Sequence, residues 1–146
     1  IGPHVRATVS AGVPVLGHIG LTPQDLLVLG GYKVQGRGEA AGRRILDDAR
    51  ALEGMGVFAM VLECLPAGLA AKVTASVGVP TIGIGAGPSC DGQILVLNDI
   101  LGMCAGRAAR FVKVYADLGA GMKAAVGRYA AEVRGGQYPD AGHSYQ

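Results

Sequence analysis

Short apolar runs at residues 13–18, 57–63, 80–85 and 93–98 alternate along the chain with segments of helical periodicity. Runs of this length, bounded by glycine and proline, are typical of buried strands. Their alternation with amphipathic segments is typical of βα units, which build parallel sheets. The pattern therefore predicts four strands of one parallel sheet.

The segments between and beyond these runs are predicted to be helical. Residues 39–54 carry apolar side chains at helical spacing and are followed by a glycine stop, and residues 66–78 begin with a proline that a first helical turn tolerates. Residues 1–11 are also predicted to be helical. For residues 105–134 we expect two helices, broken near Gly119.

Four βα units are half of a (β/α)₈ barrel, a fold that typically needs about 250 residues. The chain has 146 residues and opens on Ile1, within a predicted helix. We therefore expect residues 1–146 to be a single incomplete domain, the C-terminal half of a TIM barrel with C-terminal helices, whose N-terminal half is absent. A doubly wound sheet fits the same pattern and needs no missing half.

Composition narrows the class of function. Half of the residues are hydrophobic, 16% are charged and the formal net charge is +2, which excludes a disordered tail and gives no basic patch for nucleic acid or a membrane surface. No apolar stretch reaches the roughly 18 residues of a membrane span. Cys64, Cys90 and Cys104 are odd in number and lack CxxC spacing, so we expect reduced thiols in a cytoplasmic protein.

The run at residues 57–63 ends in the carboxylate of Glu63 after six apolar residues. Side chains alternate along a strand, so Glu63 shares a face with the small or branched Ala59 and Val61, which suit a barrel interior. Active sites of such barrels lie at the C-terminal ends of the strands. We therefore expect Glu63 to point into the barrel mouth as a general base, with an ordinary ion-paired carboxylate as the alternative.

His18 closes the first predicted strand, at what we expect to be the level of Glu63. It is a candidate for substrate binding, and a hydrogen-bonded structural histidine is the alternative. Between these strands, residues 30–38 place Lys33 and Arg37 on a glycine-rich backbone. This loop is either a mobile lid or anion contact, or a plain glycine-rich turn.

The glycine-rich run at residues 83–87 does not form a dinucleotide-binding motif, because Pro88 stands where the GxGxxG pattern requires the last glycine. We instead expect the glycines to lie on the inward face and leave room for a ligand, with the isoleucines facing the helices. The residues concerned are Gly83, Gly85 and Gly87 on one face, and Ile82 and Ile84 on the other.

Five segments, in order, closely resemble the ketopantoate hydroxymethyltransferase family. They are VPVLGHIGLTPQ (13–24), GGYKVQGR (30–37), LECLP (62–66), IGIGAG (82–87) and DGQILV (91–96). The resemblance covers nearly the whole chain.

This resemblance implies a (β/α)₈ barrel of the phosphoenolpyruvate/pyruvate superfamily, assembled as a homodecamer. It implies transfer of a hydroxymethyl group from 5,10-methylenetetrahydrofolate to the α-keto acid 3-methyl-2-oxobutanoate, giving 2-dehydropantoate for pantothenate synthesis. Glu63 matches the family's catalytic base and His18 a substrate-contacting histidine. The resemblance also implies Mg²⁺, whose ligands in the family lie upstream of Ile1, so we expect no metal ligand in this chain.

Two other functions remain open. One is a lyase or mutase of the same superfamily that acts on a small α-keto acid through an enolate. The other is a non-catalytic half-barrel with a binding or structural role.

Overall fold

The computed structural model describes residues 1–104, 106 and 108–145. They form two compact units, Ile1–Ile94 and Leu95–Gln146, which are described separately below. The prediction that residues 1–146 belong to a single incomplete domain is untested by this division and stays a prediction.

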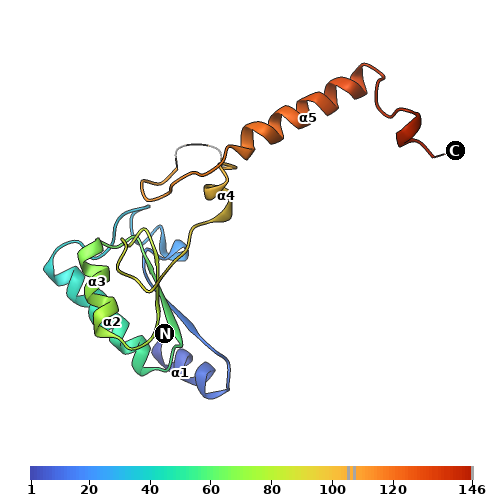
Figure 1. Cartoon of the computed structure of the whole chain (residues 1–146). Coiled ribbons are helices and arrows are strands. Elements are labelled where there is room, and N and C mark those ends of the chain that lie inside the picture. The colour runs from blue at the N-terminus through green and yellow to red at the C-terminus, as the bar shows by residue number, and fades with distance from the viewer. Residues whose placement is uncertain (105, 107, 146) are drawn as a thin grey trace. The chain divides into compact units, whose positions relative to one another are not determined.

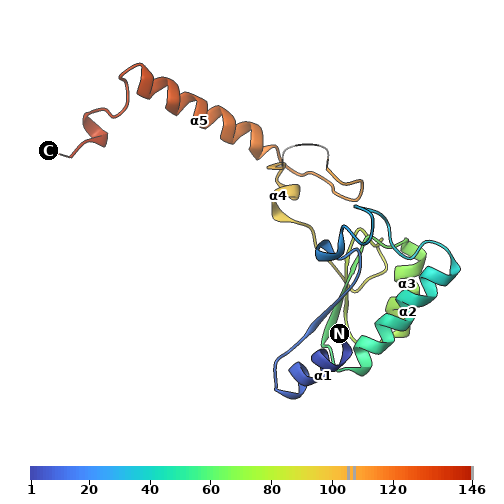
Figure 2. The same cartoon turned by 180° about the vertical axis from the view of Figure 1, so that it is seen from behind.

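The first unit is a parallel sheet with helices against one face. Its strands follow each other in the order β1-β2-β3-β4, and every neighbouring pair is parallel, as the pattern predicted. Helices α2 and α3 lie side by side on the same face of the sheet (Figure 1, Figure 2). The elements are α1 (Gly2–Ser10), β1 (Leu16–Gly20), η1 (Pro23–Asp25), α2 (Glu39–Gly54), β2 (Ala59–Glu63), α3 (Ala67–Ser76), β3 (Thr81–Ile84) and β4 (Gly92–Gln93).

The hydrophobic core lies between the sheet and these two helices. Met60 and Leu62 of β2 are fully buried there, against Val73 of α3 and Ala49 of α2. Since each buried aliphatic side chain contributes about 1.5–3 kcal/mol, this layer supplies most of the unit's hydrophobic stabilisation. The remaining buried members of the cluster are Ile19, Val57, Leu65, Leu69, Ala70 and Ala86.

The register of the sheet decides which residues face the helices. Met60 pairs with Thr81, and the Thr81 hydroxyl lies 2.9 Å from the hydroxyl of Thr74 on α3, so this row faces the helices. Gly83 is two residues beyond Thr81 and faces the helices as well. The prediction that Gly83 points inward was therefore wrong: Ile82 and Ile84 share the face of Val61 and Glu63 instead.

The first strand begins three residues later than predicted. Proline has no N–H to offer a sheet, and Pro14 precedes the first paired residue. The Val13 N–H donates to the carbonyl of Thr8 near the end of α1, so Val13 belongs to the turn that follows this helix. As a result β1 runs from Leu16 to Gly20, and His18 lies in its middle rather than at its end.

The fourth strand is much shorter than predicted. Pairing with β3 ends where Ile94 donates to the carbonyl of Gly83. The Val96 carbonyl then accepts from Asp99 and Ile100, which begins the short helix α4 (Leu97–Ile100) of the second unit. The expected strand at residues 93–98 was therefore wrong beyond its first residues.

The second unit contains α4, α5 (Leu118–Arg134) and η2 (Ala141–His143). The prediction of two helices at residues 105–134 was wrong, because residues 108–117 form turns and extended segments; Ala105 and Arg107 lie outside the described residues. The Asp117 carboxylate accepts the Ala120 N–H at 3.1 Å and caps α5, so Gly119 lies in its first turn rather than at a break.

Across the part of the chain that the structure describes, no helix combines the length and apolar character needed to cross a membrane.

Candidate active site

Glu63 is the last residue of β2, as predicted, and its side chain is 17% exposed. The chain turns sharply after it, because Cys64 adopts a left-handed conformation with φ of 51°, rare for a residue with a side chain. The Cys64 N–H donates to the carbonyl of Ile84, which fixes the end of β2 against β3. Glu63 therefore sits on a rigid strand end.

His18 meets Glu63 across the two strands. Its Nε2 atom lies 3.0 Å from Oε2 of Glu63, and its side chain is 33% exposed. The predicted common level was wrong, because His18 pairs with Val61 and Gly20 pairs with Glu63. Although His18 and Glu63 are not paired across the two strands, the imidazole ring still reaches the Glu63 carboxylate. This hydrogen bond leaves Oε1 of Glu63 with no hydrogen bond among the described residues.

Gly20 is a site residue that the sequence analysis missed. Its φ is 100°, and a Cβ at this position would overlap the carbonyl oxygen of Glu63. That carbonyl accepts the N–H of Leu21, so the two strands stay paired up to the site. Only glycine allows this close approach. The signal in the sequence was a glycine two residues after a strand histidine, too common to single out.

The Cys64 thiol beside Glu63 is held in its neutral form. Burial raises the pKa of the Cys64 thiol above 9.0, and the neighbouring charge of Glu63 raises it further. Since the thiolate is the nucleophilic form of cysteine, this shift disfavours a nucleophilic role for Cys64. The expectation that the three thiols are reduced stays a prediction.

The glycine-rich loop at residues 30–38 is tied to the same strand end. The Gln35 N–H donates to the Cys64 carbonyl at 2.9 Å, and the Gln35 side chain donates to the Lys33 carbonyl at 2.9 Å. The loop is therefore attached next to Glu63 at Gln35. Lys33 and Arg37 are both exposed, and Arg37 lines a groove on the helix side of the sheet.

The glycines after β3 serve close packing rather than ligand space. A Cβ on Gly87 would overlap the Cβ of Ala67 at the start of α3, and a Cβ on Gly83 would lie 3.0 Å from the Cys90 sulfur. The prediction that these two glycines leave room for a ligand was therefore wrong.

Thr81 and Asp91 fix the connection that follows β3. The Asp91 carboxylate accepts from the N–H of Thr81 at 2.8 Å and from its hydroxyl at 2.9 Å. These two hydrogen bonds are the main reason that the pKa of Asp91 lies below 3.8. The network is structural and lies on the helix side of the sheet, away from the face of Glu63.

Two hollows follow the free edge of β1. The larger hollow has a volume of about 780 Å³ and is lined by His18 and Ile19. Because the side chains of these neighbouring residues lie on opposite faces of the strand, this hollow extends around the edge of the sheet. A second, of about 410 Å³, continues along the same edge past Leu16 to Met55. Glu63 lines neither. The candidate site is therefore defined by the His18–Glu63 pair and not by these edge hollows.

The described residues contain no group of three or more His, Cys, Asp or Glu side chains able to hold a metal ion. Mg²⁺ is usually held by one or two carboxylates together with water and substrate oxygens, so the expectation that this chain supplies no metal ligand stays a prediction.

Together these features define a class: a parallel βα sheet that carries a carboxylate at the end of one strand, hydrogen-bonded to an imidazole in the middle of the neighbouring strand. Barrel enzymes keep their active sites at the C-terminal ends of their strands. The model of the family described as "Ketopantoate hydroxymethyltransferase" matches residues 1–141, and this chain belongs to that family. The family is of the (β/α)₈-barrel type, and the four parallel strands fit the half-barrel predicted above.

Curated relatives carry the name 3-methyl-2-oxobutanoate hydroxymethyltransferase. The Moorella thermoacetica protein is 56% identical over 144 residues, which cover 99% of this chain and 54% of that protein. The Heliobacterium modesticaldum protein is 54% identical, covering 99% and 52%, and the Geobacter metallireducens protein 54% identical, covering 97% and 53%. The chain thus spans about half the length of the curated relatives it matches.

Proposed function

We propose that the full-length protein carrying this sequence transfers a hydroxymethyl group to 3-methyl-2-oxobutanoate, and that Glu63 is its catalytic base. The observation that carries the proposal is the half-buried carboxylate at the end of β2, hydrogen-bonded on one oxygen to His18 and open on the other. The names of relatives more than 50% identical to this chain support the choice of substrate and of transferred group.

The first step is removal of the proton from C3 of the keto acid. The free oxygen Oε1 of Glu63 takes this proton, and the electron pair of the C–H bond becomes the enolate. His18, donating to Oε2, keeps the carboxylate aimed and lies beside the bound acid, where it contacts the substrate. A positioned general base of this kind contributes about 10²–10⁴-fold to a rate.

The second step forms the new carbon–carbon bond. The enolate carbon attacks the methylene carbon of 5,10-methylenetetrahydrofolate, and the bond from that carbon to one folate nitrogen breaks. Water then adds its oxygen to the same carbon, the bond to the second nitrogen breaks, and 2-dehydropantoate and tetrahydrofolate leave. The atoms balance with one water consumed. The proton held by Glu63 returns to solvent or to the leaving amine.

Mg²⁺ belongs to this proposal through the family resemblance alone. The resemblance places its ligands outside this chain, and the described residues contain no group of three or more His, Cys, Asp or Glu side chains able to hold a metal ion. No step assigned to Glu63 or His18 depends on where those ligands lie. A cytoplasmic location likewise remains a prediction.

A homo-oligomer, a decamer by resemblance, is also proposed. Helix α5 supports it, because none of its residues is buried and its apolar side chains lie three or four positions apart on one face. Exposed apolar surface of this kind marks a contact with another surface. The stripe consists of Leu118, Met122, Val126, Tyr129 and Val133.

The proposed reaction is tested by incubating the purified full-length protein with 3-methyl-2-oxobutanoate, 5,10-methylenetetrahydrofolate and magnesium, and measuring 2-dehydropantoate by mass spectrometry. We expect product that requires both organic substrates. Lyase or mutase products from the keto acid alone, or no product at all, would contradict the proposal.

A further inference from the structure

Three segments hold the chain at Cys64, the residue that follows the proposed base. The carbonyl of Glu63 accepts the N–H of Leu21, and the Cys64 N–H donates to the carbonyl of Ile84, each at 2.9 Å. The Cys64 carbonyl in turn accepts the N–H of Gln35 at 2.9 Å. Both peptide groups that flank the Cα of Cys64 are therefore bonded, one to the ends of the two neighbouring strands and the other to the glycine-rich loop.

These bonds hold Cys64 in a conformation that residues with a side chain rarely adopt. Its φ is 51°, in the left-handed region. Asparagine tolerates this region, whereas a β-branched residue is an outlier there. A change of φ at Cys64 would turn the end of β2 relative to Leu65, which is buried in the core. The direction of the Glu63 side chain therefore depends on the conformation of Cys64.

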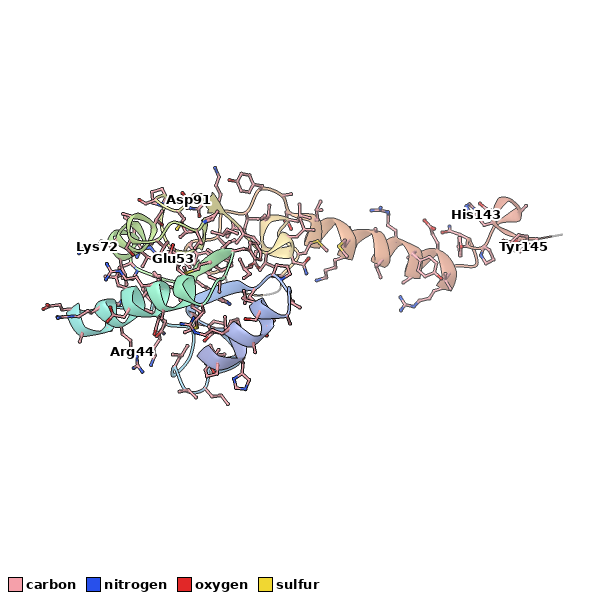
Figure 3. All side chains as sticks on the ribbon, turned by 90° about the horizontal axis from the view of Figure 1, so that it is seen from below. Arg44, Glu53, Lys72, Asp91, His143 and Tyr145 are labelled. Atoms are coloured by element: carbon pink, nitrogen blue, oxygen red, sulfur yellow. The ribbon has the colours of Figure 1, made fainter. Side chains whose placement is uncertain are left out.

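The glycine-rich loop is itself fixed where it meets the end of β2. The Gln35 side chain donates from Nε2 to the carbonyl of Lys33 at 2.9 Å, which closes the turn before the bonded N–H. Gly36 has φ of 72° and lies against Leu69 of α3, where a Cβ would overlap the leucine side chain. Figure 3 marks this helix by Lys72, about one turn after Leu69. Contacts on both sides of Gln35 thus hold its N–H in place.

We propose that Gln35 and Cys64 are positioning residues for the proton transfer, which keep the Glu63 carboxylate aimed at C3 of the keto acid without contacting the acid themselves. The inference rests on the proposed role of Glu63 as the base. The N–H of Gln35 holds the Cys64 carbonyl, and the left-handed Cys64 sets the last peptide group of β2, from which the Glu63 side chain leaves. Misplacing a reacting group by about 1 Å can cost about 10²-fold in rate. Loss of either contact should therefore slow proton removal and leave keto-acid binding unchanged.

The first test uses the left-handed conformation of Cys64 in the full-length protein. Cys64→Asn tolerates positive φ and should keep deuterium exchange at C3 of 3-methyl-2-oxobutanoate within about threefold of the unaltered rate. Cys64→Val carries a β-branched side chain and should slow this exchange at least about tenfold. Calorimetry should show unchanged keto-acid affinity in both variants. Cys104→Val, at an exposed cysteine of the second unit, is the matched control and should exchange at the unaltered rate.

The second test removes the side-chain donor of Gln35. Gln35→Glu keeps the size of the side chain, but an ionised carboxylate only accepts hydrogen bonds and cannot donate to the Lys33 carbonyl. The turn then loses its closing bond, and exchange should slow by about three- to tenfold with unchanged keto-acid affinity. Gln137→Glu, the same change at an exposed position of the second unit, should have no effect.

The two residues act through one contact, so their effects should not be additive. The double variant Gln35→Glu/Cys64→Val should exchange no more slowly than Cys64→Val alone, whereas independent effects would multiply. A purely structural role predicts a different result: the variants would lose thermal stability, but the folded fraction measured by circular dichroism would exchange at the unaltered rate.

Failure of this inference is distinct from failure of the proposed function. Unaltered exchange per folded molecule in Cys64→Val and Gln35→Glu, or effects that multiply in the double variant, would overturn the positioning roles and leave Glu63 as the base. If Cys64→Val does not fold, the result for Gln35→Glu decides. Exchange at the unaltered rate in Glu63→Gln would instead show that Glu63 is not the base, and the positioning roles would fall with it.

Discussion

Met60, Leu62 and Val73 of the first unit are fully buried, whereas Met122 and Val126 of α5 are 53% and 65% exposed. Both regions have an apolar row at regular spacing, but only the first has a second layer within the same unit to cover it. The first unit therefore holds its candidate site with its own core. The second unit has an exposed apolar surface that only contact with another surface would cover. Substitutions in the two units should accordingly affect different properties.

The largest effect is expected for Glu63→Gln. Losing the base should lower turnover by about 10²–10⁴-fold, while affinity for the keto acid stays within several-fold because the amide keeps the size of the side chain. Steady-state assays of the full-length protein, with circular dichroism to verify folding, provide the measurement. Glu132→Gln on α5 is the matched control and should leave turnover unchanged.

The two apolar rows should differ next in their contributions to stability. Leu62→Ala removes a fully buried side chain and should lower the free energy of unfolding by about 2–5 kcal/mol. Met122→Ala should change it by less than about 0.5 kcal/mol in any form where α5 is uncovered. Urea titrations measure both values. If light scattering shows a monomer and Met122→Ala still lowers the free energy of unfolding as much as Leu62→Ala does, the contrast between the buried row and the exposed row is contradicted.

A smaller effect is expected for His18→Ala, which removes the partner of Glu63 and a proposed substrate contact. Losing one hydrogen bond to a charged group costs about 1.5–3 kcal/mol, so keto-acid affinity should fall at least about tenfold. Affinity for the folate donor should change less. Calorimetry with each ligand separates the two, and unchanged keto-acid binding would count against a substrate role.

The smallest effect concerns acid stability in the first unit. The pKa of Asp91 is lowered in the folded chain, so its contribution is present above the ordinary value of 3.8 and is lost as the pH falls through the lower folded value. Unfolding curves of Asp91→Asn should therefore lose less stability on acidification below about pH 4 than the unaltered protein. Asp47→Asn, an exposed change on α2, should follow the unaltered curve.

The sequence predicted best where local pattern decides the outcome. Glu63 was found because one polar residue ends an apolar strand, and its position follows from alternation within that strand. The level of His18 and the face of Gly83 were wrong, because both depend on pairing with a neighbouring strand, which one strand's pattern does not contain. Gly20 and Gln35 contact the backbone of other segments of the chain, so the sequence around each of them does not indicate its role.

The second unit illustrates the same limit. Its helix boundary is set by the Asp117 cap rather than by the glycines that were expected to break it. Glycine costs helix stability in an interior, yet is tolerated in a first turn. Apolar side chains recur along α5 at helical spacing, but spacing alone does not reveal whether such a row is buried.

The central claim is that Glu63 removes the C3 proton, and deuterium exchange at C3 of 3-methyl-2-oxobutanoate reports this step without the folate donor. In heavy water with magnesium, NMR should show the C3 signal disappearing rapidly with the unaltered full-length protein. Glu132→Gln should exchange at the same rate, and Glu63→Gln at least about 100-fold more slowly. Exchange by a folded Glu63→Gln variant at the unaltered rate would remove Glu63 from the role of base and contradict the account.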